Sequence, residues 1–99
     1  MEEQELRGWV AGRVPTEWFV SPPEVDADRD EILITGTLPE PALEDGSDDA
    51  ARAAAREARI AGFREDTRAR RMKIAGEAER RFGRKVSWAA RCGATATTW

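Results

Sequence analysis

The chain has 99 residues, of which 40% are hydrophobic and 35% charged, and its net charge is −3. This length predicts a single domain over residues 1–99 with one modest core, and the hydrophobic fraction excludes a compositionally disordered chain. Cys92 is the only cysteine, which excludes an intramolecular disulfide. The acidic N-terminus lacks the apolar core of a signal peptide, and no apolar run approaches the ~20 residues of a membrane helix. The expected location is therefore the cytoplasm.

The net charge hides an uneven division of charge along the chain. Residues 1–50 carry fourteen acidic and three basic side chains, a net charge of −11, whereas residues 51–99 carry five acidic and thirteen basic side chains, a net charge of +8. Such asymmetry indicates a charged interaction face or two halves that attract each other.

The N-terminal third of the chain is expected to hold little regular structure. Residues 1–7 are interpreted as an acidic tail, and residues 8–14 as a short strand that Pro15 ends. Residues 15–20 form either one helical turn or a turn leading into a strand.

A β-hairpin is predicted over residues 24–38. A short run containing Val25 and Ala27 precedes a polar turn, and the following run, Glu31–Leu38, is β-branched and apolar on both faces, as in a central strand. Residues 39–49 then form an acidic linker with proline and glycine, and Ser47 or Asp48 can cap the helix that follows.

Residues 49–82 are rich in alanine and arginine and lack proline, so they are predicted to be helical. A continuous helix would be roughly 50 Å long at 1.5 Å per residue, which exceeds the body of such a domain. We therefore expect a kink or break near Gly62 or Asp66–Thr67, or one end that projects and pairs with another chain. The predicted core-facing stripe consists of Ile60, Phe63, Thr67, Ile74, Ala78 and Phe82.

Arg71 falls in the middle of this apolar stripe. In a continuous helix it would point inward and need a carboxylate or backbone carbonyls, whereas a break near Asp66–Thr67 would leave it outside. A buried Arg71 paired with an N-terminal acid would tie the two charged halves together. Gly83 is expected to cap the helix, and a strand over residues 84–88 follows, with Val86, Trp88, Ala90 and Cys92 alternating toward the core.

These elements predict an α+β fold in the order β-β-β-α-β. Three or four strands form an antiparallel sheet, and one long helix packs on one of its faces.

No catalytic, metal or cofactor site emerges from the motifs. The chain has no histidine, the commonest general acid or base. The segment Asp26–Asp30 matches the first ligands of a calcium loop, but Glu31 and Thr37 stand where the loop needs glycine and glutamate, so a solvated turn is favoured. No glycine-rich phosphate loop is present, and Cys92 is expected to be buried and inert. The chain is therefore interpreted as not an enzyme, with no cofactor.

Arginines in the predicted helix are the strongest functional signal. Cations at this density can neutralise several phosphates, the contacts that dominate nucleic-acid affinity. The candidate contact residues are Arg64, Arg68, Arg70, Arg80, Arg81 and Arg84. The competing interpretation is that the chain's own carboxylates neutralise these arginines.

Several segments also resemble a known group of proteins. They are Trp18–Phe19, Glu31–Gly36, Phe63–Arg68, Arg71–Ala75 and Ala78–Trp88. Together they resemble a group of small, uncharacterised actinobacterial proteins, and the resemblance covers most of residues 8–93. It implies no known activity, and the chain departs from the group's pattern after Gly93.

Two functional hypotheses follow. The first is a non-enzymatic nucleic-acid-binding or regulatory accessory protein that uses the arginine-rich helix. The alternative is a protein-interaction module, most simply a homodimer in which the acidic segment of one copy meets the arginine helix of the other. No membrane partner is expected.

Overall fold

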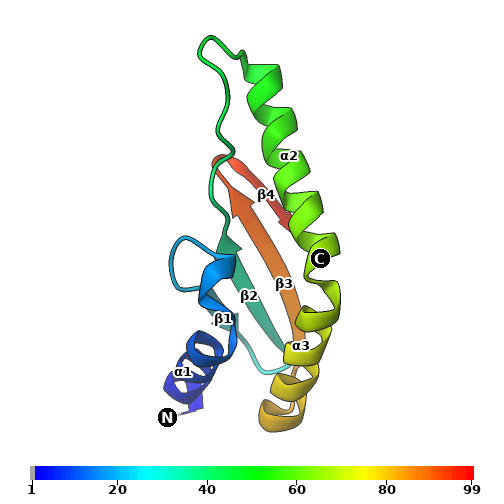
Figure 1. Cartoon of the computed structure of the whole chain (residues 1–99). Coiled ribbons are helices and arrows are strands. Elements are labelled where there is room, and N and C mark those ends of the chain that lie inside the picture. Colours follow the sequence, from blue (N-terminus) through cyan, green and yellow to red (C-terminus); the bar gives the residue numbers. More distant parts are fainter. Residues whose placement is uncertain (1) are drawn as a thin grey trace.

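The structure, a computed structural model, describes residues 2–99. Helices and strands follow one another along the chain as shown in Figure 1. Their bounds are α1 (Glu2–Arg13), the short 3₁₀ helix η1 (Thr16–Trp18), β1 (Glu24–Ala27), β2 (Glu31–Thr37), α2 (Asp49–Asp66), α3 (Arg68–Phe82), β3 (Lys85–Cys92) and β4 (Thr95–Thr98). Within the described range, no helix has both the length and the apolar character needed to cross a bilayer.

The four strands form a mixed sheet in the order β1-β2-β3-β4. The pairs β1–β2 and β3–β4 are antiparallel, but the central pair β2–β3 is parallel, with Glu31 opposite Lys85 and Thr37 opposite Arg91. The α+β class is confirmed, whereas the expectation of a purely antiparallel sheet is wrong. The reason is the crossover: α2 and α3 return the chain to the level at which β2 begins, so β3 runs in the same direction.

The N-terminal segment is a helix, which corrects both the acidic tail over residues 1–7 and the strand over residues 8–14. Leu6 and Val10 are fully buried and lie four residues apart, so they share one face of α1. The acidic side chains of the first turn are favourable beside the positive end of the helix dipole. The order of elements therefore begins with a helix, not with a strand.

The predicted long helix is broken into α2 and α3 at Thr67, one of the two places expected from the sequence. The Thr67 hydroxyl donates to the Phe63 carbonyl at 2.6 Å, a contact that tends to bend helices. The predicted first and last caps of the helical region are confirmed as well. Asp48 accepts a hydrogen bond from the Ala51 N–H at 2.8 Å, and Gly83 adopts a left-handed conformation with φ 69°.

The core lies between the helices and one face of the sheet. Figure 1 shows α2 and α3 running along the β3–β4 side, while η1 lies beside β1 and β2. Ile32 and Ile34 of β2 are fully buried, and Trp88 of β3, opposite Ile34, is 3% exposed. The alternation predicted for β3 is confirmed in part: Trp88, Ala90 and Cys92 are buried as expected, but Ala89, on the opposite face, is buried as well.

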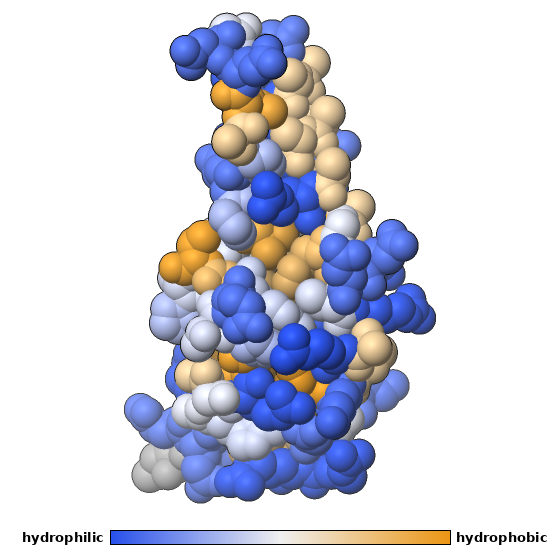
Figure 2. All heavy atoms as spheres, in the orientation of Figure 1, coloured by the Kyte–Doolittle hydropathy of each residue, from blue (hydrophilic) through white to orange (hydrophobic). Residues whose placement is uncertain are grey.

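The first half of α2 extends beyond the sheet. The molecule measures 49 × 24 × 22 Å, and its long axis is set by this half of α2 together with the linker before it. Figure 2 shows a pale orange row along the projecting helix. The exposed alanines there include Ala50, Ala51, Ala53 and Ala54. The hairpin of residues 24–38 is confirmed, and residues 39–48 of the predicted linker form neither helix nor strand.

Gly36 and Gly62 offer a matched test of this packing. A Cβ at Gly36 would overlap the ring of Phe19, whereas a Cβ at Gly62 meets nothing within 4 Å. Gly36→Ala is expected to lower the free energy of unfolding by about 1–3 kcal/mol through overpacking. Gly62→Ala is expected to raise it by up to about 1 kcal/mol through helix propensity. Urea unfolding followed by tryptophan fluorescence measures both, and equal stabilities of the two variants would contradict the packing described.

Candidate functional site

Arg71 is a buried cation at the break between α2 and α3. Its side chain is 3% exposed. Its Nε donates to the Thr67 hydroxyl at 2.9 Å, and one terminal nitrogen donates to the Arg64 carbonyl at 2.6 Å. Carbonyls at a helix break lose their helical partners, and the guanidinium supplies a donor to one of them. The guanidinium also lies 4.9 Å from the ring centroid of Trp99, so it joins the helix break to the residue that follows β4.

This arrangement differs from both expectations for Arg71. The helix breaks, yet the side chain is inside, and within residues 2–99 its partners are a hydroxyl, a carbonyl and an aromatic ring with no carboxylate among them. The tie to an N-terminal acid is therefore wrong. Burial lowers the pKa of Arg71 from its ordinary value, and the positive charges of Arg64 and Arg68 lower it further.

Two of the six arginines predicted to contact phosphates, Arg64 and Arg68, lie around this buried cation. The Arg64 guanidinium is 5.5 Å from the Trp99 ring centroid, and Arg68 is exposed one helical turn before Arg71 on the chain. Phe63 stacks on Trp99, with ring centroids 6.3 Å apart and planes inclined by 21°. We call Arg64, Arg68, Arg71 and Trp99 the kink cluster. Within the part of the chain that the structure describes, none of its arginines forms an ion pair.

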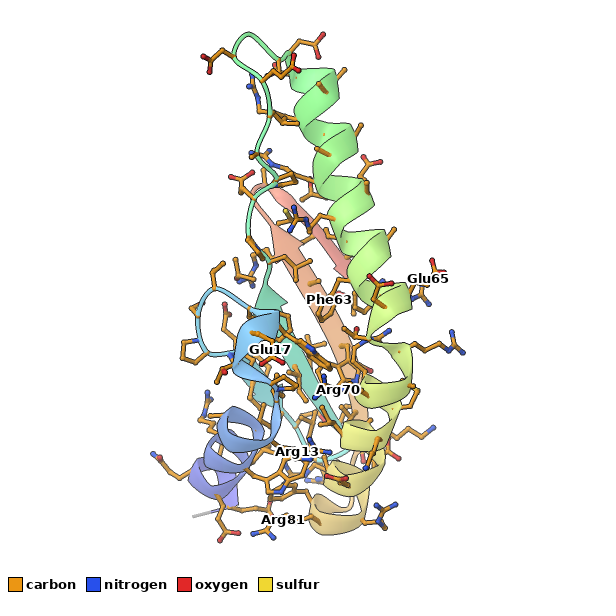
Figure 3. All side chains as sticks on the ribbon, viewed as in Figure 1. Arg13, Glu17, Phe63, Glu65, Arg70 and Arg81 are labelled. Atoms are coloured by element: carbon orange, nitrogen blue, oxygen red, sulfur yellow. The ribbon has the colours of Figure 1, made fainter. Side chains whose placement is uncertain are left out.

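The other four predicted contact residues lie elsewhere. Figure 3 shows Arg70 and Arg81 on the side of α3 that faces η1 and α1, and Arg70 stacks over Trp18 at 5.6 Å. Arg81 pairs with Glu5 at 3.7 Å, and Arg84 pairs with Glu2. Arg80 is exposed on α3. The six arginines therefore do not gather in one place, and only two of them belong to the kink cluster.

Ion pairs join the acidic and basic halves within one chain. They involve both ends of α1, the linker and β1, and they leave the helix break out. In four of the five pairs the acidic half supplies the carboxylate, and in the fifth it supplies the arginine. The pairs are Arg13–Glu77 at 2.6 Å, Arg56–Glu40 at 2.7 Å, Arg91–Glu24 at 2.6 Å, Arg81–Glu5 at 3.7 Å, and Arg84–Glu2. The attraction expected from the charge division therefore operates inside the molecule for part of the basic half.

Carboxylates near the kink cluster form no ion pair with its arginines among residues 2–99. Glu57 and Glu65 of α2 enter no ion pair among residues 2–99, and Figure 3 shows Glu65 directed away from the sheet. Asp66, next to the break, also enters no ion pair among residues 2–99. The arginines of the cluster are thus unpaired within residues 2–99, although Glu57 and Glu65 line the same groove as Arg64 and Arg68.

The remaining chemical candidates serve the fold. The Asp28 carboxylate accepts hydrogen bonds from the N–H groups of Asp30 and Glu31 at 2.8 and 2.9 Å, which lower its pKa, so it organises the hairpin turn. Cys92 is fully buried, as expected, and burial raises the pKa of its thiol. Its Sγ lies 3.7 Å from the Pro39 carbonyl oxygen.

Trp99 is the site residue that sequence reasoning missed. The sequence did contain one signal for this site: Arg71 lies within an apolar stripe, and a buried cation requires partners. Those partners could not be named in advance, since Trp99 is 28 positions further along the chain and reaches Arg71 only through the pairing of β4 with β3.

Together, the fold and the kink cluster define a small α+β protein with a cationic and aromatic site at its helix break. The chain belongs to the Rv1265-like proteins: the family model described as "Rv1265-like protein, N-terminal domain" matches residues 4–98. It is 46% identical over 85 residues to the uncharacterized proteins Rv1265 of Mycobacterium tuberculosis and Mb1296 of Mycobacterium bovis. The match covers 86% of this chain and 36% of each relative, so the chain spans about a third of their length. The resemblance to uncharacterised actinobacterial proteins is thereby confirmed. No solved structure matches the chain.

Removing the Arg71 side chain should weaken the fold more than removing its exposed neighbour. Arg71→Ala takes away two hydrogen bonds and leaves a cavity, so we expect the free energy of unfolding to fall by about 2–3 kcal/mol. Arg70→Ala removes only a surface contact with Trp18 and should cost less than about 1 kcal/mol. Urea unfolding at neutral pH compares the two variants. A loss of stability for Arg71→Ala no larger than that for Arg70→Ala would refute the role assigned to the buried cation.

The Arg13–Glu77 pair predicts a dependence of stability on acid. The hydrogen bond from Arg13 lowers the pKa of Glu77 below its ordinary value. The pair's contribution is therefore complete above the unfolded-state pKa of about 4.3 and is lost as the pH falls through the lower folded-state value. Wild type should lose more stability between neutral pH and about pH 3 than Glu77→Gln does. Arg13→Gln, which removes the other partner, should reduce the acid dependence in the same way, and a wild-type acid profile in both variants would contradict the prediction.

Proposed function

We propose that this chain is a non-enzymatic nucleic-acid-binding accessory protein whose phosphate contacts centre on the kink cluster. One observation carries the proposal: three arginines meet at the helix break without an ion-pair partner among residues 2–99, whereas four other arginines of the basic half pair with carboxylates of the acidic half. An unneutralised group of cations favours anions, and nucleic-acid phosphates bind to such groups with affinity that depends on salt.

The arginines of the cluster would act in two ways. Arg64 and Arg68 are exposed, and their planar guanidinium groups can donate two parallel hydrogen bonds to one phosphate. Arg71 is buried and its Nε is already bonded to Thr67, so it would contribute its charge and the position of the break.

The arginines outside the cluster would contribute less. Arg81 and Arg84 would have to leave Glu5 and Glu2 before they could meet a phosphate, although such surface pairs are weak. Arg70 and Arg80 are exposed and would add to the attraction at longer range. We place this activity in the cytoplasm.

The homodimer stays an alternative prediction, and the fold sets its geometry. Glu40 near the start of the acidic linker pairs with Arg56 in the middle of α2, a helix of 18 residues, whereas the last residues of the linker, 44–48, and the kink cluster lie at opposite ends of this helix. A rigid helix of this length keeps them roughly 25 Å apart within one chain, at 1.5 Å per residue. Residues 44–48 of the linker could therefore meet the cluster only in another copy.

Replacing Arg64 and Arg68 together tests the proposed function. We expect Arg64→Ala/Arg68→Ala to bind a fluorescently labelled oligonucleotide at least tenfold more weakly at low salt. The slope of its log–log salt dependence should be shallower by about 0.7–0.9 for each phosphate that the variant no longer neutralises. The measurement is fluorescence anisotropy with single-stranded and duplex probes over a salt series.

The matched control is Arg81→Ala/Arg84→Ala, which removes the same charge from arginines already paired with α1. It should weaken binding less than about threefold. Absence of salt-dependent binding by wild type, or an equal reduction of affinity in both double variants, would count against the proposal.

A further inference from the structure

A groove lies beside the kink cluster, between α2, the start of α3 and β4. Its volume is about 460 Å³, within the range of small-molecule sites. Apolar surface comes from α2 and from the residue after β4, and cationic side chains stand at the end nearest the helix break. Two carboxylates line it as well, and the lining residues are Glu57, Ile60, Ala61, Arg64, Glu65, Arg68, Thr97 and Trp99.

We propose that this groove takes one unpaired nucleotide, so that the protein binds single-stranded nucleic acid in preference to duplex. The inference rests on the proposed function and names the class of nucleic acid that the same site would recognise. The base would lie against Ala61, Ile60 and the Trp99 ring, and its phosphate would meet Arg64 and Arg68.

The combination of surfaces fits a nucleotide. Bases bind to proteins by stacking on aromatic rings and on guanidinium planes, and every base has such a face. Trp99 is half-buried, with Phe63 stacked on it and the guanidinium of Arg64 5.5 Å from its centroid, so the ring is held in a defined position beside the groove. The small side chain of Ala61, which is exposed, leaves room between the helix and the sheet.

The same features disfavour a duplex. A base inside a duplex is stacked and paired, so it cannot enter a groove of this size unless it leaves the helix. A straight basic helix could instead lie in the major groove, but α2 and α3 are broken at Thr67 and Arg70 stands over Trp18 on another flank. The charges of Glu57 and Glu65, which also line the groove, oppose any phosphate there, and a duplex brings more phosphates close to them than one unpaired nucleotide does.

A comparison of probes and two leucine variants tests the inference. The probes are a labelled single-stranded DNA 12-mer, its duplex, and an abasic 12-mer with the same phosphates but no bases. Wild type should bind the single strand about tenfold more tightly than either of the others, as expected for one base contact. Ala61→Leu, which fills the groove, should remove this difference and leave duplex binding unchanged.

Ala54→Leu is the matched control, because it adds the same side chain to an exposed alanine two turns earlier on α2, outside the groove. It should bind all three probes as wild type does, and thermal melts should show that both leucine variants are folded. Equal wild-type binding of the three probes, with weaker binding by Arg64→Ala/Arg68→Ala, would overturn the single-strand inference and leave the proposed function standing. Absence of binding to any probe at low salt would overturn both.

Discussion

The burial of one arginine organises the middle of this molecule. Arg71 joins three parts of the chain, because it contacts the end of α2 through the Arg64 carbonyl, the break through Thr67 and the end of the sheet through Trp99. A buried cation without a carboxylate is costly, so its hydrogen bonds and the aromatic ring must offset the loss of hydration. The break that they stabilise lets α2 pack against both β3 and β4 while α3 packs against β3.

The charge division of the sequence has two different consequences in the fold. On α1, the linker and β1, acidic side chains pair with arginines of the other half and hold the molecule together. At the helix break the arginines have no such partners among residues 2–99, and they lie beside a groove with an aromatic wall. The proposals of phosphate binding and of a single-stranded ligand both depend on this separation between structural and unpaired cations.

Local patterns predicted a good part of the fold. The hairpin, the caps at Asp48 and Gly83, and the break near Asp66–Thr67 each depend on a few neighbouring residues, so sequence reasoning found them. Residues 8–14 were mistaken for a strand because Trp9, Val10 and Val14 suit either period, and the buried Leu6 that completes the helical face lies in the supposed tail. The parallel pairing of β2 and β3 depends on where a long crossover ends, which no short pattern records.

By itself, the sequence determined the helices after residue 48, the strands with alternating apolar residues and the excess of arginine between Arg64 and Lys85, because these follow from composition and period. It also marked Arg71 as a cation in an apolar stripe. Only the tertiary structure decided which arginines are neutralised, that Arg71 is inside although the helix breaks, and that Trp99 completes the site. The physical reason is that ion pairs and burial depend on distances between residues far apart in the chain, and packing alone sets those distances.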